Sequence, residues 1–275
     1  APGGADQGGA DVTLKTAVDL GSASWPVLRF WGRSDFELDA DSGHVEVSTN
    51  GGSSWTGVFG TSGTADTWTH YRVDLSPFKG HDSVLIRFHS RSNGSVVADG
   101  WCIDDVEISE HLAPARAIPF EESFDGGADD WLASNWELES VDPRSGTQRM
   151  QDFPRGEIIS YGDFANTLSG EFDLSATSNP QLVFWIKGAT GYKQSFRAQV
   201  STDHGVTWSD AWAQGATWDD WTRIQVSLAA YREPATRLRF VTRASNYWDG
   251  TGVALDDVAL ADEPDAPTME VPTQH

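Results

Sequence analysis

Two acidic pairs are the residues of this chain best suited to holding a cation. Asp104-Asp105 recurs as Asp256-Asp257, 152 positions later. On an extended strand Asp256 shares a face with Val258 and Leu260, whereas Asp257 points to the opposite face. An ionised carboxylate stays on an apolar face only if backbone donors or a cation compensate its charge. Each pair therefore predicts either a metal site or a carboxylate held by amide hydrogens.

A third acid could complete such a site in the second half of the chain. In Phe120-Glu-Glu-Ser-Phe124, Glu122 shares the apolar face of the two phenylalanines. First and last strands are neighbours in many β-sandwiches, so Glu122 and Asp256 could meet, and two like charges need a hard cation between them. The sequence therefore predicts a structural Ca²⁺ held by Glu122, Asp125 and Asp256. Asp104 is the corresponding ligand in the first half, which has no counterpart of Glu122. The alternative is that each acid caps backbone amides at a strand end.

A set of aromatic residues in loop-like stretches of the second half could bind a sugar or a protein surface. Exposed rings next to Asp and Asn side chains can stack on sugar rings while the polar groups bond hydroxyls, and they also form protein hot spots. The alternative is that these rings close the edge of a sandwich or an interface between units. The predicted ligand-binding residues are Tyr192, Trp212, Trp218, Tyr247 and Trp248.

Three other tryptophan positions recur in both halves, so we expect them to be shared packing residues. The recurring pairs are Trp31/Trp185, Trp55/Trp208 and Trp68/Trp221.

The segment Ser201–Trp208 fits the Asp-box pattern Ser-x-Asp-x-Gly-x-Thr-Trp, and Ser48–Trp55 is a degraded copy. In such a turn Asp or Asn accepts amides of its own turn, and Gly takes a positive φ. Several such boxes occur in glycan-hydrolysing propellers, whose blades recur at about 40–50 residues. The two boxes here are 153 residues apart. The spacing therefore favours structural hairpins.

The sequence predicts no catalytic residue. The seven His residues lack the His-Glu-x-x-His spacing of a zinc peptidase, and no Gly-x-Ser-x-Gly elbow is present. The single cysteine, Cys102, excludes a disulfide framework and is expected to be a small core residue rather than a nucleophile. A glycosidase needs only two carboxylates about 5–10 Å apart. The 41 acidic residues permit such pairs, so a jelly-roll glycan hydrolase or lyase remains an alternative.

Internal repeats indicate how the elements that carry these residues are organised. Pro26–Trp31 returns as Pro180–Trp185, and Ile103–Val106 returns as Leu255–Val258. Ordered matches of this kind indicate a tandem duplication. We predict a first unit over residues 1–110, a linker over 111–119, a second unit over 120–262 and an acidic Pro-rich tail over 263–275. The first unit has only 12 residues before its first Thr-Leu motif, so its opening strands are missing or altered.

Alternation of apolar and polar residues is the dominant periodicity in both units. Segments 83–89, 197–201 and 237–242 show the period of two that is typical of half-buried strands. Gly, Asn, Asp and Ser separate these segments, as they do in sandwiches. The predicted fold class is all-β, with two tandem jelly-roll β-sandwiches.

Composition restricts the partners. Asp and Glu number 41 against 19 Lys and Arg, which gives a net charge of −22 at pH 7. This charge argues against a nucleic-acid partner, because phosphate binding needs basic patches. The sequence has no apolar run of about 18 residues, so we expect no membrane insertion. The start at Ala1, without an initiator Met, suggests a processed product or an excised fragment.

Four segments carry a resemblance to a known family. Phe120–Gly127, Leu182–Trp185, Val200–Gly205 and Leu255–Val258 resemble the MAM-like jelly-roll modules of bacterial secreted proteins. These modules include cleaved-adhesin or choice-of-anchor J domains and C-terminal modules of immune inhibitor A-like metallopeptidases. The resemblance covers about residues 118–262 and 12–110. It implies a jelly roll, often with a structural Ca²⁺ that joins the first and last strands.

The function predicted from residues and resemblance together is a non-catalytic accessory or adhesin-type binding region of a secreted bacterial protein, often a peptidase. Its expected location is extracellular or on the cell surface. Its partner would be a polysaccharide or protein surface, including a catalytic domain of the same parent protein. The alternative is a carbohydrate-binding module of a polysaccharide-degrading enzyme.

Overall fold

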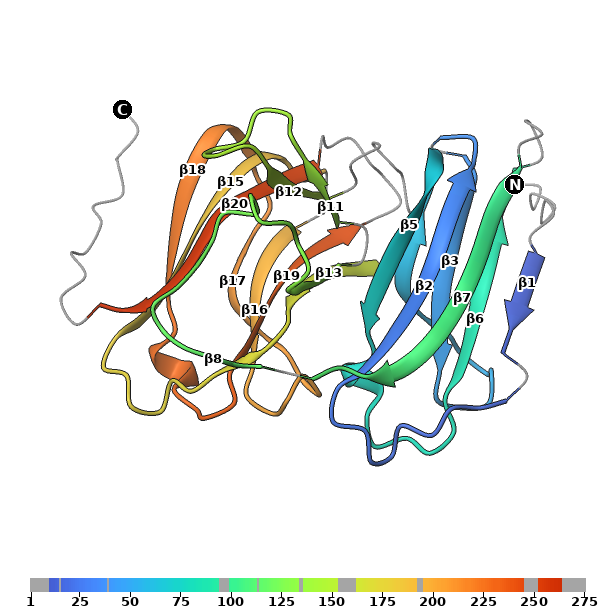
Figure 1. Ribbon diagram of the computed structural model, residues 1–275, viewed down its shortest axis with the longest axis horizontal. Helices are drawn as coiled ribbons and strands as arrows, with labels where there is room; N and C mark the ends of the chain where they lie inside the picture. The colour runs from blue at the N-terminus through green and yellow to red at the C-terminus, as the bar shows by residue number, and fades with distance from the viewer. Residues whose placement is uncertain are drawn as a thin grey trace, which may run out of the picture.

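The structure is a computed structural model. It describes residues 10–14, 16–38, 40–93, 99–112, 114–133, 136–152, 162–191, 195–244 and 252–263. The chain forms two consecutive β-sandwiches, which lie side by side in space (Figure 1). The all-β class and the tandem jelly-roll architecture predicted from the sequence are confirmed.

The first sandwich packs a four-stranded sheet on a three-stranded one. The four-stranded sheet has the order β1 (Ala10–Thr13), β6 (Leu85–Arg91), β3 (Ser42–Ser48), β4 (Thr56–Thr61). The three-stranded sheet has the order β5 (Thr64–Asp74), β2 (Pro26–Asp35), β7 (Gly100–Glu110). Phe30 packs edge-on against Phe59 and Phe88, with centroid distances of 5.4 and 5.3 Å. Each such buried ring contributes about 1.5–3 kcal/mol to folding.

The second sandwich has more strands. One sheet has the order β10 (Trp131–Ala133), β13 (Gly162–Leu168), β19 (Arg237–Ala244), β16 (Ser195–Ser201), β17 (Ser209–Gln214). The other has the order β11 (Trp136–Glu139), β12 (Arg149–Asp152), β20 (Gly252–Asp262), β15 (Pro180–Ala189), β18 (Thr217–Ser227). β9 (Phe120–Glu122) also pairs with β20. Phe196 and Phe240 stack in its core with a centroid distance of 5.8 Å.

The two sandwiches share one strand order. The order β1-β6-β3-β4 corresponds to β13-β19-β16-β17, and β5-β2-β7 corresponds to β18-β15-β20. Within the described residues, the first unit has no counterpart of the strands β9 to β12. β20 is therefore paired on both sides, whereas β7 is an edge strand (Figure 1).

The segment between the units lies against the second unit. β8 (Ala115–Arg116) pairs in parallel with β14 (Glu171–Phe172). Trp25 and Val27 of the first unit form a small buried cluster with Leu132 of the second.

Short 3₁₀ turns follow β5 and β18, namely η1 (Ser76–Phe78) and η2 (Ala229–Tyr231). In the described ranges, no helix has the length and apolar character needed to cross a membrane.

Candidate functional site

Asp256 on β20 is fully buried and is held by amide hydrogens. Its Oδ2 accepts hydrogen bonds from the amides of Arg144 at 2.8 Å and Ser145 at 3.4 Å, and its Oδ1 accepts one from Asp257 at 2.8 Å. Burial raises the pKa of Asp256, and the amides of Asp257 and Arg144 oppose that rise. This is the amide-capped geometry that the sequence left open as the alternative to a cation.

Asp125 accepts hydrogen bonds from the other end of the loop that contains Arg144 and Ser145. Its Oδ1 accepts hydrogen bonds from the Thr147 amide at 2.5 Å, the Thr147 hydroxyl at 2.9 Å and the Gln148 amide at 3.1 Å. The hydrogen bonds from Thr147 hold the pKa of Asp125 below its usual value. Residues 144–148, the loop before β12, are therefore fixed by carboxylates at both ends. We call residues 142–148 the covering loop.

Glu122 and Asp104 have separate partners. Glu122 Oε1 accepts the Phe124 amide at 2.8 Å, and Oε2 accepts the indole N–H of Trp131 at 3.2 Å. Asp104 is exposed in the first unit, where Oδ1 accepts the Asp105 amide at 2.8 Å. Among the residues that the structure describes, no three His, Cys, Asp or Glu gather closely enough to hold one metal ion. As they stand, these carboxylates do not fit a single cation, and calcium stays a prediction.

The covering loop also shields two tryptophans of the second unit. The Arg144 guanidinium lies 4.2 Å from the ring centroid of Trp185, and its Nη1 lies 2.7 Å from Asp257 Oδ2. Trp221 donates its indole N–H to the carbonyl of Asp142 at 3.3 Å. The loop thus lies against two of the tryptophan positions that recur between the units, and both rings are half-buried.

The aromatic residues predicted to bind a ligand do not form an exposed platform where the structure describes them. Trp218 is 7% exposed. Trp212 lies with its ring centroid 5.7 Å from that of Phe184 and 6.3 Å from that of Trp218. Both rings therefore close one side of the second core, which was the alternative interpretation. Tyr192, Tyr247 and Trp248 lie outside the described residues.

Among the tryptophans that the structure describes, the exposed ones lie instead in the first unit. Trp31 is 39% exposed and Trp68 is 44% exposed, which corrects the expectation that both are packing residues. The His70 ring stacks on Trp31 with a centroid distance of 5.0 Å. We call Trp31, Trp68 and His70 the tryptophan face. It is open because the described first unit has no counterpart of the covering loop, and the shorter first repeat was the sequence signal for this difference.

Polar groups surround the tryptophan face. Strand register places Trp31 opposite Asp104, and Arg33 Cζ lies 5.6 Å from the ring centroid of Trp68. A neighbouring hollow of about 120 Å³ shares Arg33 with this face, but none of the three rings lines it. Burial, and then the charges of Arg72 and Arg29, lower the pKa of His70, so its ring is neutral at pH 7. The face therefore offers flat apolar rings beside a carboxylate and a guanidinium.

The two Asp-box segments form local turns. Asp203 Oδ1 accepts the Ser201 hydroxyl at 2.8 Å and the Thr207 amide at 2.9 Å. In the first unit Asn50 Oδ1 accepts the Ser54 amide at 2.9 Å. These hydrogen bonds fix the shape of each turn, so these side chains have a structural role.

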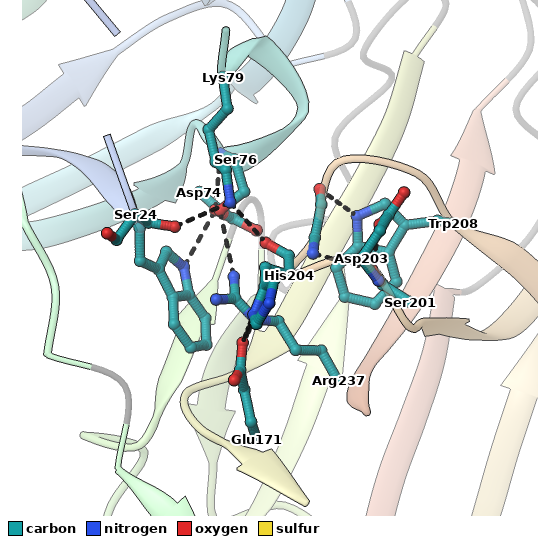
Figure 2. Close-up of polar contacts among 12 residues, drawn as sticks. Ser24, Asp74, Ser76, Lys79, Glu171, Ser201, Asp203, His204, Trp208 and Arg237 are labelled. Carbon is teal, nitrogen blue, oxygen red and sulfur yellow. Dashed lines mark hydrogen bonds and ion pairs between the residues drawn. The ribbon is translucent and has the colours of Figure 1, made fainter. Parts of the chain in front are cut away.

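The Ser201–Trp208 turn of the second unit docks on the first unit (Figure 2). Lys79 donates to the carbonyl of His204 at 3.2 Å, and His204 Nδ1 lies 2.9 Å from Glu171 Oε1. Arg237 donates to the same carboxylate oxygen at 2.7 Å. Burial alone would raise the pKa of Glu171, but the hydrogen bonds from His204 and Arg237 outweigh it and hold that pKa below its usual value. This cluster joins the two units.

Comparison with known proteins gives one sequence relative and several structural ones. No family model matches the chain. Bacillopeptidase F of Bacillus subtilis (strain 168) is 34% identical over 97 residues, which is 35% of this chain and only 6% of that protein. The chain therefore spans a small fraction of this relative.

The solved structures share low identity with the chain. The CBM22-1-CBM22-2 tandem domain of Paenibacillus barcinonensis Xyn10C is 16% identical over 92% of this chain and 82% of its own, with a TM-score of 0.37. TmCBM61 with galactotriose is 16% identical over 51% and 94%, with a TM-score of 0.38. The K2 cleaved adhesin domain of Lys-gingipain is 12% identical over 52% and 88%, with a TM-score of 0.33.

Proposed function

We propose that the protein is a non-catalytic binding module whose first unit binds a polysaccharide on the tryptophan face. The observation that carries the proposal is the exposure of Trp31 and Trp68, 39% and 44%, on one face of an ordered sheet. Aromatic side chains left in water forgo the free energy of burial, so a cluster of them marks an interaction site. A flat indole can take the apolar face of a sugar ring. Asp104 and Arg33 can bond its hydroxyls, because a carboxylate accepts and a guanidinium donates.

The charge of the chain favours a neutral polysaccharide. A net charge of −22 repels polyanions at long range, so an acidic glycan would approach slowly and bind weakly at low salt. This proposal moves the binding site from the second unit, where the sequence suggested it, to the first. The second unit then supports the first through the Glu171–Arg237 cluster.

The test is binding to a panel of soluble polysaccharides, measured by calorimetry and by retardation in affinity gels. We expect Trp31→Ala and Trp68→Ala to weaken binding at least tenfold, the loss typical of an aromatic anchor. Val141→Ala, which changes an exposed side chain of the second unit, should leave binding unchanged. Binding to no neutral polysaccharide, or equal binding by all variants, would refute the proposal. Release of reducing sugar would instead support the hydrolase or lyase alternative.

A second candidate is an accessory, adhesin-type region of a secreted peptidase. The 34% identity to Bacillopeptidase F over 97 residues supports it. In that case the tryptophan face would hold a protein surface, and the chain would work outside the cell. Immobilised casein can replace the polysaccharide in the same assay. Binding to casein that is lost in Trp31→Ala, together with no binding to polysaccharide, would favour this candidate.

Calcium stabilisation of the second unit is retained as a separate proposal. Glu122, Asp125 and Asp256 would be its ligands, and the covering loop would have to release the oxygens that its amides now occupy. A ligand bound only by the folded state raises the melting temperature by mass action. The proposal predicts a lower melting temperature in EDTA than in calcium. An unchanged melting curve would refute it.

A further inference from the structure

The outer edges of β7 and β20 differ although the two strands are repeats of each other. β20 pairs with β15 on one side and, on its other side, with β9 at Val258–Leu260 and with β12 at Ala254 and Leu255. In the described part of the chain, β7 pairs with β2 alone. Its second edge therefore presents unpaired backbone groups of the kind that accept another strand.

Matched residues of β7 and β20 differ in exposure, because β9 and β12 pair with β20 rather than with β7. Val258 is 1% exposed, whereas its counterpart Val106 is 40% exposed. Asp256 is fully buried, whereas Asp104 is exposed. The backbone itself is alike: Asp105 has φ +48° and Asp257 has φ +45°. β7 therefore keeps the backbone irregularity that β20 has at the matching residue.

We propose that the outer edge of β7 receives an antiparallel strand from a partner polypeptide, with an aromatic residue opposite Ile108 and a basic residue opposite Glu107. The register of β9 on β20 supplies the template. Phe120 lies opposite Leu260, which matches Ile108, and Glu121 lies opposite Ala259, which matches Glu107. Opposite charges on directly paired residues stabilise a sheet, so the partner residue that faces Glu107 is basic.

The first unit carries a smaller side chain at the place that Phe120 contacts in the second unit. Phe120 packs on Phe172 with a centroid distance of 5.4 Å. Phe172 forms an isolated bridge with Thr236, and the matching bridge of the first unit joins Val18 to Val84. Val18 is smaller than phenylalanine and is only half-buried. An aromatic side chain beside Ile108 would cover it.

Charge argues against a second copy as the occupant. Two β7 edges pairing with each other would bring Asp104, Asp105 and Glu107 close to the same acids of the other copy. These residues are exposed, and like charges across a strand pair are destabilising. A basic partner strand removes that repulsion, and backbone hydrogen bonds to an exposed edge supply affinity.

The test uses the full chain and two labelled peptides of residues 118–127, one unchanged and one with Glu121→Lys. Fluorescence anisotropy at low salt should show saturable binding of the Glu121→Lys peptide. Val106→Lys in the chain places a charge on the docking surface and should weaken this binding at least tenfold. Val12→Lys, which changes a 66% exposed valine on β1, is the matched control and should not weaken it.

Reversing the charge of Glu107 distinguishes specific strand pairing from general electrostatic attraction between the chain and the peptide. Glu107→Lys in the chain should reverse the preference, so that the unchanged peptide binds better than the Glu121→Lys peptide. No binding of either peptide at about 1 mM, which corresponds to about −4 kcal/mol, would overturn the proposal. So would binding that ignores both Val106→Lys and Glu107→Lys. A chain dimer that Val106→Lys dissociates, with no peptide binding, would assign the edge to a second copy and also overturn it.

Discussion

The guanidinium carbon of Arg237 in the second unit lies 3.5 Å from the ring centroid of Trp25 in the first unit. Both side chains are almost fully buried, at 3% and 1% exposure. The indole N–H of Trp25 donates to Asp74 at 3.1 Å. A desolvated cation on an aromatic face contributes about 2 kcal/mol or more. This contact therefore fixes the orientation of one unit on the other.

Arg237→Ala should uncouple the units. It leaves the Glu171 carboxylate without its guanidinium and uncovers Trp25, so we expect a loss of about 2 kcal/mol or more. Scanning calorimetry should show one transition in the wild type and two in the variant, because units without a tight interface unfold separately. Arg232→Ala, which changes an exposed arginine of the same unit, should stay within about 0.5 kcal/mol. A single unchanged transition in Arg237→Ala would contradict the coupling.

Matched substitutions in the two acidic pairs should differ strongly. Asp256→Ala leaves the amides of Arg144, Ser145 and Asp257 without an acceptor inside the fold, so we expect a loss of about 3 kcal/mol. Asp104→Ala changes the exposed counterpart and should stay within about 0.5 kcal/mol. Urea denaturation of both variants measures the difference. Equal losses would mean that the burial of Asp256 does not determine its contribution.

Periodicity and repeats could predict much of this molecule. The period of two identified the strands, and the placement of Asp256 on an apolar face predicted a buried carboxylate that needs compensation. Both inferences depend on local geometry, which a sequence encodes directly. Trp31 and Trp185 occupy equivalent positions in segments that share four of six residues, yet only Trp185 lies under the covering loop. Coverage depends on Arg144, which is more than 40 residues from Trp185 in sequence.

Strand pairing explains why Trp212 and Trp218 lie on strands rather than in loops. Residues 209–220 contain three Asp, one Ser and one Gly, which are turn-forming residue types, and their three Ala have low strand propensity. In the structure, β17 and β18 extend through this segment, because pairing with β16 and β15 overrides the weak local preference. The rings then point into the core. A sequence pattern cannot supply that tertiary pairing.

Gly146 should be sensitive to any side chain. Its φ is +60°, and an added Cβ would lie 1.8 Å from Asp125 Oδ2. Gly146→Ala therefore combines left-handed backbone strain with loss of the Asp125 hydrogen bonds, and we expect it to cost about 2 kcal/mol or more. Gly57→Ala, whose Cβ would meet nothing within 4 Å, is the control and should be near neutral. Thermal unfolding of both variants gives the comparison, and equal melting temperatures would show that Asp125 can move aside.

His44 should make the first unit sensitive to mild acid. Its side chain is buried, and its Nε2 lies 2.9 Å from the Ser42 hydroxyl. Burial, and then the charges of Arg91 and His89, lower the pKa of His44 to about 3. The unfolded chain binds a proton at this residue near pH 6.5 and the folded chain does not, so stability falls as pH drops from 6.5 toward 3.

Because of His44, the free energy of unfolding should fall by about 2 kcal/mol between pH 7 and pH 5. This follows from about 1.4 kcal/mol for each pH unit below 6.5. Glu171 and Asp125 have lowered pKa values, so their losses begin only below about pH 4.5, where model carboxyl groups titrate. The measurement is urea denaturation of the wild type and of His44→Gln at several pH values from 5 to 7.5. The difference between the two slopes isolates His44, because all other groups are shared. The His44→Gln slope should be flatter over this range, and parallel slopes would show that His44 becomes protonated without unfolding the first core.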